Sequence, residues 1–232
     1  MKKEIIPYVF IDQEAEKIID VANRIPGWFS TADMLFMFHL IKQFNTPINF
    51  LEIGSYRGKS TSVILTTLPK NSTLVCVDSF ADNFEHDVNN KIIGPMTGEE
   101  LYNYFKTNTS TVIETYERQD ITFVDYKSDS VEFCKMNKDT YNKFFDVIFI
   151  DGGHTYEQVK KDLIASLPLL KDGGIICGHD FGTHCKGVFQ FVYSELRNVV
   201  TQKCYIKDGY GTTCWMIEPE NIAQVKEKYK IS

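Results

Sequence analysis

A chain of 232 residues fits one large α/β domain, and 43% hydrophobic, 24% charged and 13% aromatic residues are ordinary values for a globular protein. The formal net charge of −6 argues against a general nucleic-acid binder, which needs a basic face. The longest apolar window, Met34–Ile41, is too short to span a bilayer, and no apolar core of signal-peptide length follows Met1. Because the six cysteines contain no CxxC pair, we expect a reduced, cytoplasmic protein with no membrane partner.

Two helices are expected before the first strand. Residues 14–23 and 31–44 carry helical spacing of apolar side chains. Ser30 followed three residues later by Asp33 is typical of a capped helix start.

From residue 48 onwards, short apolar runs alternate with helical stretches. The expected strands are 49–53, 74–77, 122–124, 147–150 and 174–177. The expected helices are 60–68, 98–115, 130–136, 155–170 and 187–198. Continuously apolar strands that alternate with helices predict a parallel, doubly wound sheet with both faces covered.

The last part of the chain has a different pattern. Two β-like runs, 202–206 and 212–217, flank an Asp208-Gly209 pair, which is a hairpin signal, so the sheet is expected to end in an antiparallel pair. Residues 81–97 show no period and are expected to form a long surface loop.

The strand at 49–53 runs into a glycine turn and then a helix. Gly54 allows a sharp turn and Gly58 a close helix contact, but the spacing fits neither a dinucleotide fingerprint nor a P-loop. Glu52 would repel a phosphate but could receive an ammonium group, directly or through water. Asp78, at the end of the next strand, is placed to accept hydrogen bonds from ribose hydroxyls.

Glu52-x-Gly54-x-x-x-Gly58 followed by Asp78 resembles the class I S-adenosylmethionine-dependent methyltransferases. The segments 149–157 and 170–180 resemble later motifs of the small-molecule O-methyltransferases of the catechol and macrolide-sugar type. The resemblance implies an α/β, Rossmann-like, mostly parallel seven-stranded sheet with an antiparallel C-terminal hairpin and helices on both faces. It also implies that residues 1–45 form a helical segment packed on the core and the substrate entrance, and that 46–232 form the methyltransferase domain.

The resemblance further implies where S-adenosylmethionine is bound. The implied cofactor-binding residues are Glu52, Gly54, Ser55, Tyr56, Ser60, Asp78, Ser79, Ser128, Asp129, Ser130 and Asp151. Among these, 54–56 would line the methionine part, Ser60 would meet its carboxylate at the helix start, and 128–130 would lie at the adenine edge.

The catalytic end is expected where Asp151 and Asp180 follow neighbouring strands. In metal-dependent relatives the matching segments give oxygen ligands to a divalent cation, so Mg²⁺ or another divalent ion between these two carboxylates is one hypothesis. His179 would also suit a softer transition metal. His154 matches the position of the base in the catechol-type family, and Asp151 and His154 are the expected catalytic residues. Either the cation binds the acceptor oxygen and His154 takes the proton, or His154 acts alone; we favour the metal-assisted form.

The expected function is therefore O-methylation of a small hydroxyl-bearing metabolite or sugar. A non-catalytic S-adenosylmethionine-binding or interaction protein with the same fold is the alternative, and the set Glu52, Asp78, Asp151 and His154 favours the enzyme. The missing G-x-G-x-x-G disfavours an NAD-dependent oxidoreductase. The sequence leaves open whether the chain forms a homo-oligomer, and it does not identify the methyl acceptor.

Overall fold

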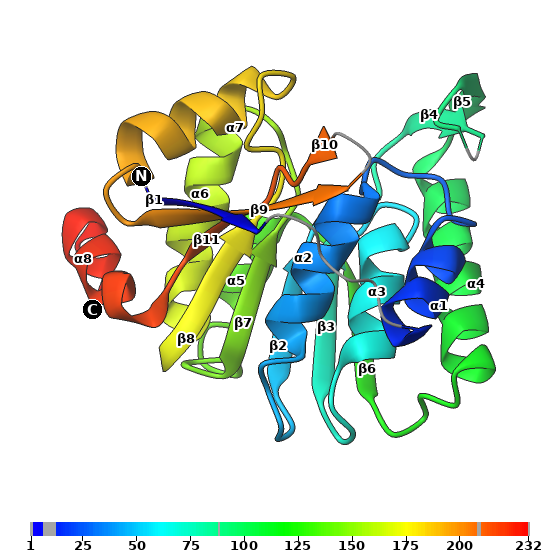
Figure 1. Cartoon of the computed structure of the whole chain (residues 1–232), viewed down its shortest axis with the longest axis horizontal. Coiled ribbons are helices and arrows are strands. Elements are labelled where there is room, and N and C mark those ends of the chain that lie inside the picture. Colours follow the sequence, from blue (N-terminus) through cyan, green and yellow to red (C-terminus); the bar gives the residue numbers. More distant parts are fainter. Residues whose placement is uncertain (1, 7–12, 88, 208–209, 232) are drawn as a thin grey trace.

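A nine-stranded sheet lies at the centre of the computed structural model, which describes residues 2–6, 13–87, 89–207 and 210–231 (Figure 1). The strands are β1 (Lys2–Ile6), β2 (Asn49–Ile53), β3 (Thr73–Asp78), β4 (Asn83–His86), β5 (Ile92–Met96), β6 (Thr122–Lys127), β7 (Phe145–Ile150), β8 (Leu170–Gly178), β9 (Val200–Lys207), β10 (Tyr210–Gly211) and β11 (Trp215–Ile217). The helices are α1 (Gln13–Ala22), α2 (Thr31–Ile41), α3 (Lys59–Thr67), α4 (Gly98–Thr115), α5 (Ser130–Met136), α6 (Tyr156–Ser166), α7 (Lys186–Phe191) and α8 (Pro219–Tyr229). A 3₁₀ turn (Leu167–Leu169) follows α6, and a π-helical turn (Val192–Leu196) follows α7.

The strand order of the main sheet is β1-β9-β11-β8-β7-β2-β3-β6, with β10 paired to β9. Strands β8, β7, β2, β3 and β6 pair in parallel, and β11 lies antiparallel between β8 and β9. The expected doubly wound, mostly parallel sheet with an antiparallel C-terminal pair is confirmed. The short strands β1 and β10 extend this seven-stranded core at its β9 edge, and the Asp208-Gly209 pair lies outside the described residues.

Three elements differ from the sequence expectation. The predicted loop at 81–97 instead contains the antiparallel hairpin β4–β5, which forms a sheet of its own. Helix α8 and strand β1 were not expected, because their short patterns carry little periodic signal. None of the helices in the described ranges is both long and apolar enough to cross a membrane.

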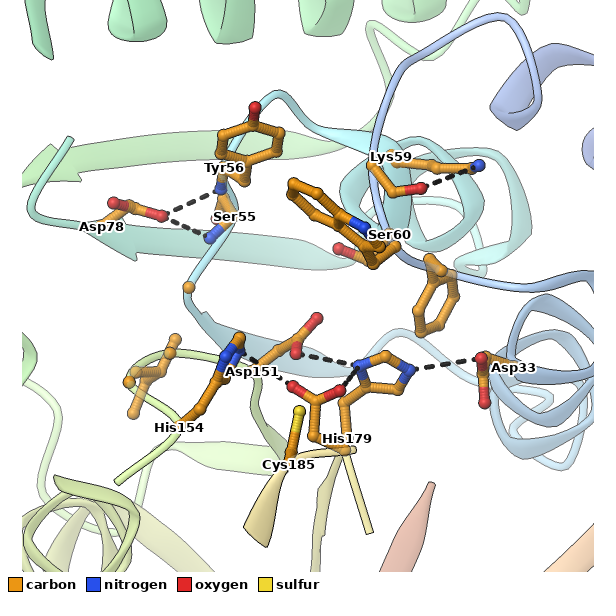
Figure 2. A pocket seen from close by; sticks show the side chains of 18 of the residues that line it. Asp33, Ser55, Tyr56, Lys59, Ser60, Asp78, Asp151, His154, His179 and Cys185 are labelled. Atoms are coloured by element: carbon orange, nitrogen blue, oxygen red, sulfur yellow. Dashed lines mark hydrogen bonds and ion pairs between the residues drawn. The ribbon is translucent and has the colours of Figure 1, made fainter. Parts of the chain in front are cut away.

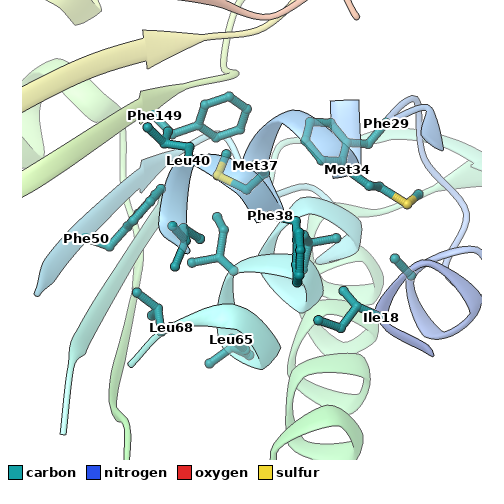
Figure 3. Packing of buried hydrophobic residues seen from close by; sticks show 14 of the residues in the cluster. Ile18, Phe29, Met34, Met37, Phe38, Leu40, Phe50, Leu65, Leu68 and Phe149 are labelled. Atoms are coloured by element: carbon teal, nitrogen blue, oxygen red, sulfur yellow. The ribbon is translucent and has the colours of Figure 1, made fainter. Parts of the chain in front are cut away.

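The helices divide between the two faces of the sheet, as Figure 1 shows. Helices α1 to α4 share one buried cluster with alternate strand residues such as Phe50 and Phe149. Helices α5 to α8 share the other cluster with the intervening residues, such as Leu51 and Ile148. Figure 3 shows the first cluster, where α2 packs beside α3 over the sheet. Strands buried on both faces explain the continuous apolar runs in the sequence.

Helix α2 is buried almost all round, and its start is fixed by a reciprocal cap. The Ser30 side chain accepts a hydrogen bond from the Asp33 amide, and the Asp33 carboxylate accepts one from the Ser30 amide. The expected capped start at Ser30 is therefore confirmed. Because the cap uses one carboxylate oxygen of Asp33, the other oxygen is left to point into the body of the protein.

The strand order reverses between β2 and β7, and the backbone segments that follow these two strands lie in close contact. The Asp151 amide donates to the Ile53 carbonyl over 2.7 Å, so the residues after β2 and β7 are held side by side. Gly54 has φ of +88°, and a Cβ there would lie 2.1 Å from the Asp151 carbonyl oxygen. The need for glycine at 54 therefore comes from the neighbouring strand as well as from the turn.

We predict that Gly54→Ala destabilises the protein by several kcal/mol more than Gly173→Ala. Gly173 has a similar φ of +82°, but its added Cβ would meet no atom within 4 Å, so its substitution costs only the backbone strain of about 1 kcal/mol. Urea unfolding of both variants measures the difference. Equal stability of the two variants would show that the contact with Asp151 does not constrain this turn.

Candidate active site

A cavity of about 1230 Å³ opens at the carboxyl ends of the parallel strands, across the point where the strand order reverses (Figure 2). This is where doubly wound sheets bind their ligands. The expected site residues that line it are Gly54, Ser55, Tyr56, Ser60, Asp78, Ser79, Ser128, Asp129, Ser130, Asp151, His154 and Asp180. The structure thus brings together every expected site residue except Glu52.

The glycine turn is held in shape by Asp78. One carboxylate oxygen of Asp78 accepts hydrogen bonds from the amides of Ser55 and Tyr56, both over 2.9 Å. Its other oxygen accepts one from the Phe80 amide over 2.7 Å. Each oxygen has two lone pairs, so the second oxygen keeps capacity for a ligand donor in the cavity. Asp78 therefore both shapes the turn and presents an acceptor to the cavity.

Glu52 was expected to receive an ammonium group directly or through water, but it does not line the cavity in this structure. It is fully buried, and its carboxylate accepts hydrogen bonds from the hydroxyls of Ser55, Ser60 and Thr61. Burial raises the pKa of Glu52 to about 7, although these hydroxyl donors act in the opposite direction. Glu52 therefore ties the start of α3 to the end of β2, and its effect on a ligand acts through Ser55 and Ser60.

The expected adenine-edge segment reaches the cavity, but its side chains already have partners. Asp129 caps α5 by accepting from the amides of Val131 and Glu132. The Ser130 hydroxyl donates to the buried carboxylate of Asp162 over 2.5 Å. The Ser128 amide donates a hydrogen bond to the Asp78 carbonyl. The segment is therefore held rigidly beside the end of β3.

His179 is the centre of a buried ion-pair network at the other end of the cavity. Its Nδ1 lies 3.1 Å from Asp151 Oδ1 and 3.3 Å from Asp180 Oδ1, and its Nε2 lies 3.2 Å from Asp33 Oδ2 (Figure 2). Burial would lower the pKa of His179, but Asp151 and Asp33 outweigh it and hold that pKa well above its usual value. The three carboxylates around the ring therefore favour its protonated form.

Asp33 anchors this network to two distant parts of the chain. Its Oδ1 accepts hydrogen bonds from the Thr212 hydroxyl over 2.7 Å and the Thr213 amide over 2.8 Å. Burial opposes ionisation of Asp33, but the charge of His179 and the hydrogen bonds from His179, Ser30 and Thr212 hold its pKa well below the usual value. The start of α2, the end of β8 and the segment before β11 thus meet at one charged centre.

His154 and Asp180 form a separate pair at the cavity rim. His154 Nε2 lies 2.9 Å from Asp180 Oδ2, and the His154 side chain is 59% exposed. The hydrogen bond to Asp180 raises the pKa of His154 above its usual value. Asp180 has a left-handed backbone with φ of +63°, a conformation that aspartate tolerates better than most residues. The pair leaves Nδ1 of His154 as the ring nitrogen that can serve a ligand.

The expected divalent-cation site between Asp151 and Asp180 stays a prediction, and these two residues and His179 offer ligand atoms that all lie within 4.8 Å of one another. Mg²⁺ prefers near-octahedral oxygen ligands, and the Oδ1 atoms of both carboxylates lie 3.1 and 3.3 Å from Nδ1 of His179. Besides the metal-assisted form, which the sequence favoured, the structure offers a form without a metal ion in which His179 holds these two carboxylates.

Asp33, Lys59, His179 and Cys185 also line the cavity, although the sequence did not assign them to it. Asp33 was expected as a helix cap, and His179 only as a ligand for a softer metal. Cys185 carried no signal beyond its type. Lys59 Nζ donates to the Gly27 carbonyl over 3.2 Å. The signal that could have placed Lys59 in the cavity is its position at the start of a helix, directly after the glycine turn that follows a strand.

Comparison with known protein families gives one match. A family model described as a methyltransferase domain matches residues 51–181, which is more than half of the chain. The matched range runs from β2 to the residue after Asp180 and so contains the glycine turn, Asp78, Asp151 and His154. A comparison with curated proteins finds no match.

Solved structures with a similar fold include several O-methyltransferases. An O-methyltransferase from Bacillus cereus in complex with SAH has 17% identity and a TM-score of 0.54, over 92% of each chain. TomG from Streptomyces achromogenes, an O-methyltransferase of tomaymycin synthesis in complex with SAM, has 12% identity and a TM-score of 0.57, and the match covers 91% of this chain and 92% of TomG. CalS11, a TDP-rhamnose 3′-O-methyltransferase of calicheamicin biosynthesis, has 15% identity and a TM-score of 0.56, and the match covers 89% of this chain and 93% of CalS11. At these identities the likeness concerns the fold.

We predict that the free energy of unfolding contains a pH-dependent contribution from Glu52 that Glu52→Gln removes. Because the pKa of Glu52 is about 7 in the folded protein and near its ordinary value when unfolded, the folded state binds the proton more tightly. Stability from this group is therefore fully present below the unfolded pKa and falls by up to roughly 3 kcal/mol as the pH rises to about 7.

Urea unfolding at pH 5 and pH 7.5 measures this contribution, because all other groups titrate alike in both proteins. The wild type should lose more stability than Glu52→Gln between the two pH values. The same loss in both proteins would contradict the raised pKa.

Proposed function

Because the chain belongs to the methyltransferase domain family, we propose that it is an S-adenosylmethionine-dependent O-methyltransferase that acts on a small hydroxyl-bearing metabolite or sugar. The observation that supports this most is that one cavity joins the glycine turn and Asp78 to the His154–Asp180 pair. In this proposal residues 1–45 form a segment at the site entrance, apart from β1, which pairs with β9 of the sheet, and residues 46–232 form the methyltransferase domain. Three neighbours of similar fold bear on the class: two are described with SAH or SAM, and one as a sugar 3′-O-methyltransferase.

The chemistry of the cavity suits S-adenosylmethionine. Its volume of about 1230 Å³ exceeds the common upper range of about 1,000 Å³ for small-molecule sites, which leaves room for an acceptor beside a nucleoside cofactor. Lys59 and the first turn of α3 offer a positive charge and amides to a carboxylate. Asp78 offers an acceptor to hydroxyl groups, and Asp151 offers a carboxylate near the middle of the cavity. These are the donors and acceptors that an amino acid joined to a ribose requires.

The proposed reaction needs a proton acceptor beside the hydroxyl that is methylated. The cofactor supplies a sulfonium methyl group when it is bound. Asp180 holds Nε2 of His154, so Nδ1 is placed to take the proton, and the carboxylate then stabilises the imidazolium that forms. Oδ1 of Asp151 is paired with Nδ1 of His179 over 3.1 Å, which orients this side chain in the cavity.

A non-catalytic protein that binds the cofactor remains the second candidate function, because binding depends only on the glycine turn and Asp78. Incubation with labelled S-adenosylmethionine and a panel of sugar and phenol acceptors separates the two. The enzyme transfers label to an acceptor and releases S-adenosylhomocysteine, whereas a binding protein retains the cofactor unchanged.

We predict that Asp78→Asn weakens binding of S-adenosylhomocysteine by about 2 kcal/mol, or roughly thirtyfold, because hydrogen bonds to a charged acceptor are lost. Asp82→Asn is the matched control, since Asp82 also lines the cavity but accepts from the Gly98 amide of α4. Calorimetric titration gives both affinities, and thermal unfolding shows whether each variant is folded. Unchanged affinity in folded Asp78→Asn would remove Asp78 from the cofactor site.

We predict that His154→Ala lowers the turnover rate by roughly 10²–10⁴, the usual contribution of a general base. His184→Ala is the control, because His184 lines the same cavity without an assigned role. Since the proposed base needs no metal ion, treatment of the wild type with a chelator should leave turnover unchanged. Turnover that disappears on chelation and returns with Mg²⁺ would contradict this mechanism and support the metal-assisted one.

A further inference from the structure

Three different metal-ligating side chains meet at the rim of the cavity. His154 lies between β7 and α6, Asp180 follows β8, and Cys185 precedes α7. One ligand atom from each lies within 4.8 Å of the other two. All three residues line the cavity, so the group is open to ions from solvent. We propose that His154, Asp180 and Cys185 form a binding site for one thiophilic divalent cation of the zinc class.

The spacing of the three atoms suits a small tetrahedral ion. With metal–nitrogen and metal–oxygen distances of about 2.0 Å and a metal–sulfur distance of about 2.3 Å, tetrahedral ligand atoms lie about 3.3–3.6 Å apart. His154 Nε2 and Asp180 Oδ2 are 2.9 Å apart, and the ligand atoms that the three residues offer all lie within 4.8 Å of one another. Shifts of about 1 Å or less therefore bring the three into a coordination shell. The fourth position would face the cavity.

The mixture of ligand types selects the kind of metal. A thiolate with an imidazole is a soft set that zinc favours, whereas Mg²⁺ and Ca²⁺ favour oxygen. Three protein ligands and one open position are also the arrangement of zinc sites that bind a further ligand. The site shares Asp180 with the pair Asp151 and Asp180, but His154 lies at Oδ2 of Asp180, whereas His179 lies at its Oδ1.

Two other groups of histidine, cysteine and aspartate side chains in the described part of the chain are less suited to bind a metal ion. Asp33, His179 and Cys214 are buried, and the carboxylate of Asp33 already accepts hydrogen bonds from Ser30 and Thr212. In the group of Asp151, His179 and Asp180, the buried ring lies between the two carboxylates. The side chain of His154, in contrast, is 59% exposed.

Zinc at this site has a consequence for methyl transfer, which rests on the proposed function. A neutral imidazole that binds zinc through Nε2 carries its proton on Nδ1. Nδ1 then has no lone pair for the proton of the acceptor hydroxyl. Bound zinc should therefore inhibit the reaction, and removal of the Cys185 ligand should weaken that inhibition.

Titration with Co²⁺, followed by its absorption spectrum, tests the site in the absence of cofactor and acceptor. We expect a thiolate-to-cobalt charge-transfer band and intense tetrahedral d–d bands at one equivalent, both displaced by Zn²⁺. Cys134→Ala should keep these bands, since Cys134 is buried in α5 and does not line the cavity. Cys185→Ala should lose the charge-transfer band and lower zinc affinity at least about tenfold in competition with a chromophoric chelator. His154→Ala should keep the band and lower zinc affinity at least about tenfold.

Absence of a charge-transfer band in the wild type would overturn the proposal, and so would a band that persists in Cys185→Ala. Unchanged zinc affinity in folded His154→Ala would also overturn it, because the ion would then be held without the imidazole. Circular dichroism confirms that each variant is folded. Since no step of this experiment uses S-adenosylmethionine, a chain that binds zinc but transfers no methyl group would contradict only the proposed function.

Discussion

The buried imidazolium of His179 is the interaction on which the rest of the site depends. Three carboxylates, Asp33, Asp151 and Asp180, converge on one ring that is only 5% exposed. Carboxylates this close would repel one another in a medium of low dielectric constant, and a central cation makes their convergence favourable. Removal of that one positive charge would leave buried negative charges without a partner, which is far more costly than the loss of a surface ion pair.

The network also connects the fold to the site. Asp151 lies at the end of β7, beside Gly54 at the end of β2, so the charged centre and the glycine turn share one strand boundary. Asp33 brings in the start of α2, whose other side packs on α3 over the sheet. The two ends of the cavity are thus held by different means: hydrogen bonds to Asp78 and Glu52 at the turn, and ion pairs to His179 at the catalytic end.

Most of the sheet and its edge residues could be predicted from the sequence, because buried parallel strands leave continuous apolar runs that end in polar residues. Asp78, Asp151 and Asp180 were found in this way. Asp33 could not be found, since one carboxylate serves both a local cap and a contact 180 residues away, and only the cap is visible locally. The burial of Glu52 could not be predicted either, because a strand-end position does not reveal which face of the sheet the side chain enters; it enters the face that α3 covers. The β4–β5 hairpin was missed because it pairs only with itself and carries no buried alternation.

A crystal structure of the complex with S-adenosylhomocysteine tests the central claim most directly. The account predicts that the ligand lies in the cavity above the switch between β2 and β7. Its ribose should contact Asp78, its carboxylate should lie near Lys59 and the start of α3, and its sulfur should be directed toward Asp151 and His154. A ligand bound outside this cavity, or bound in it with the sulfur directed away from His154, would contradict the account.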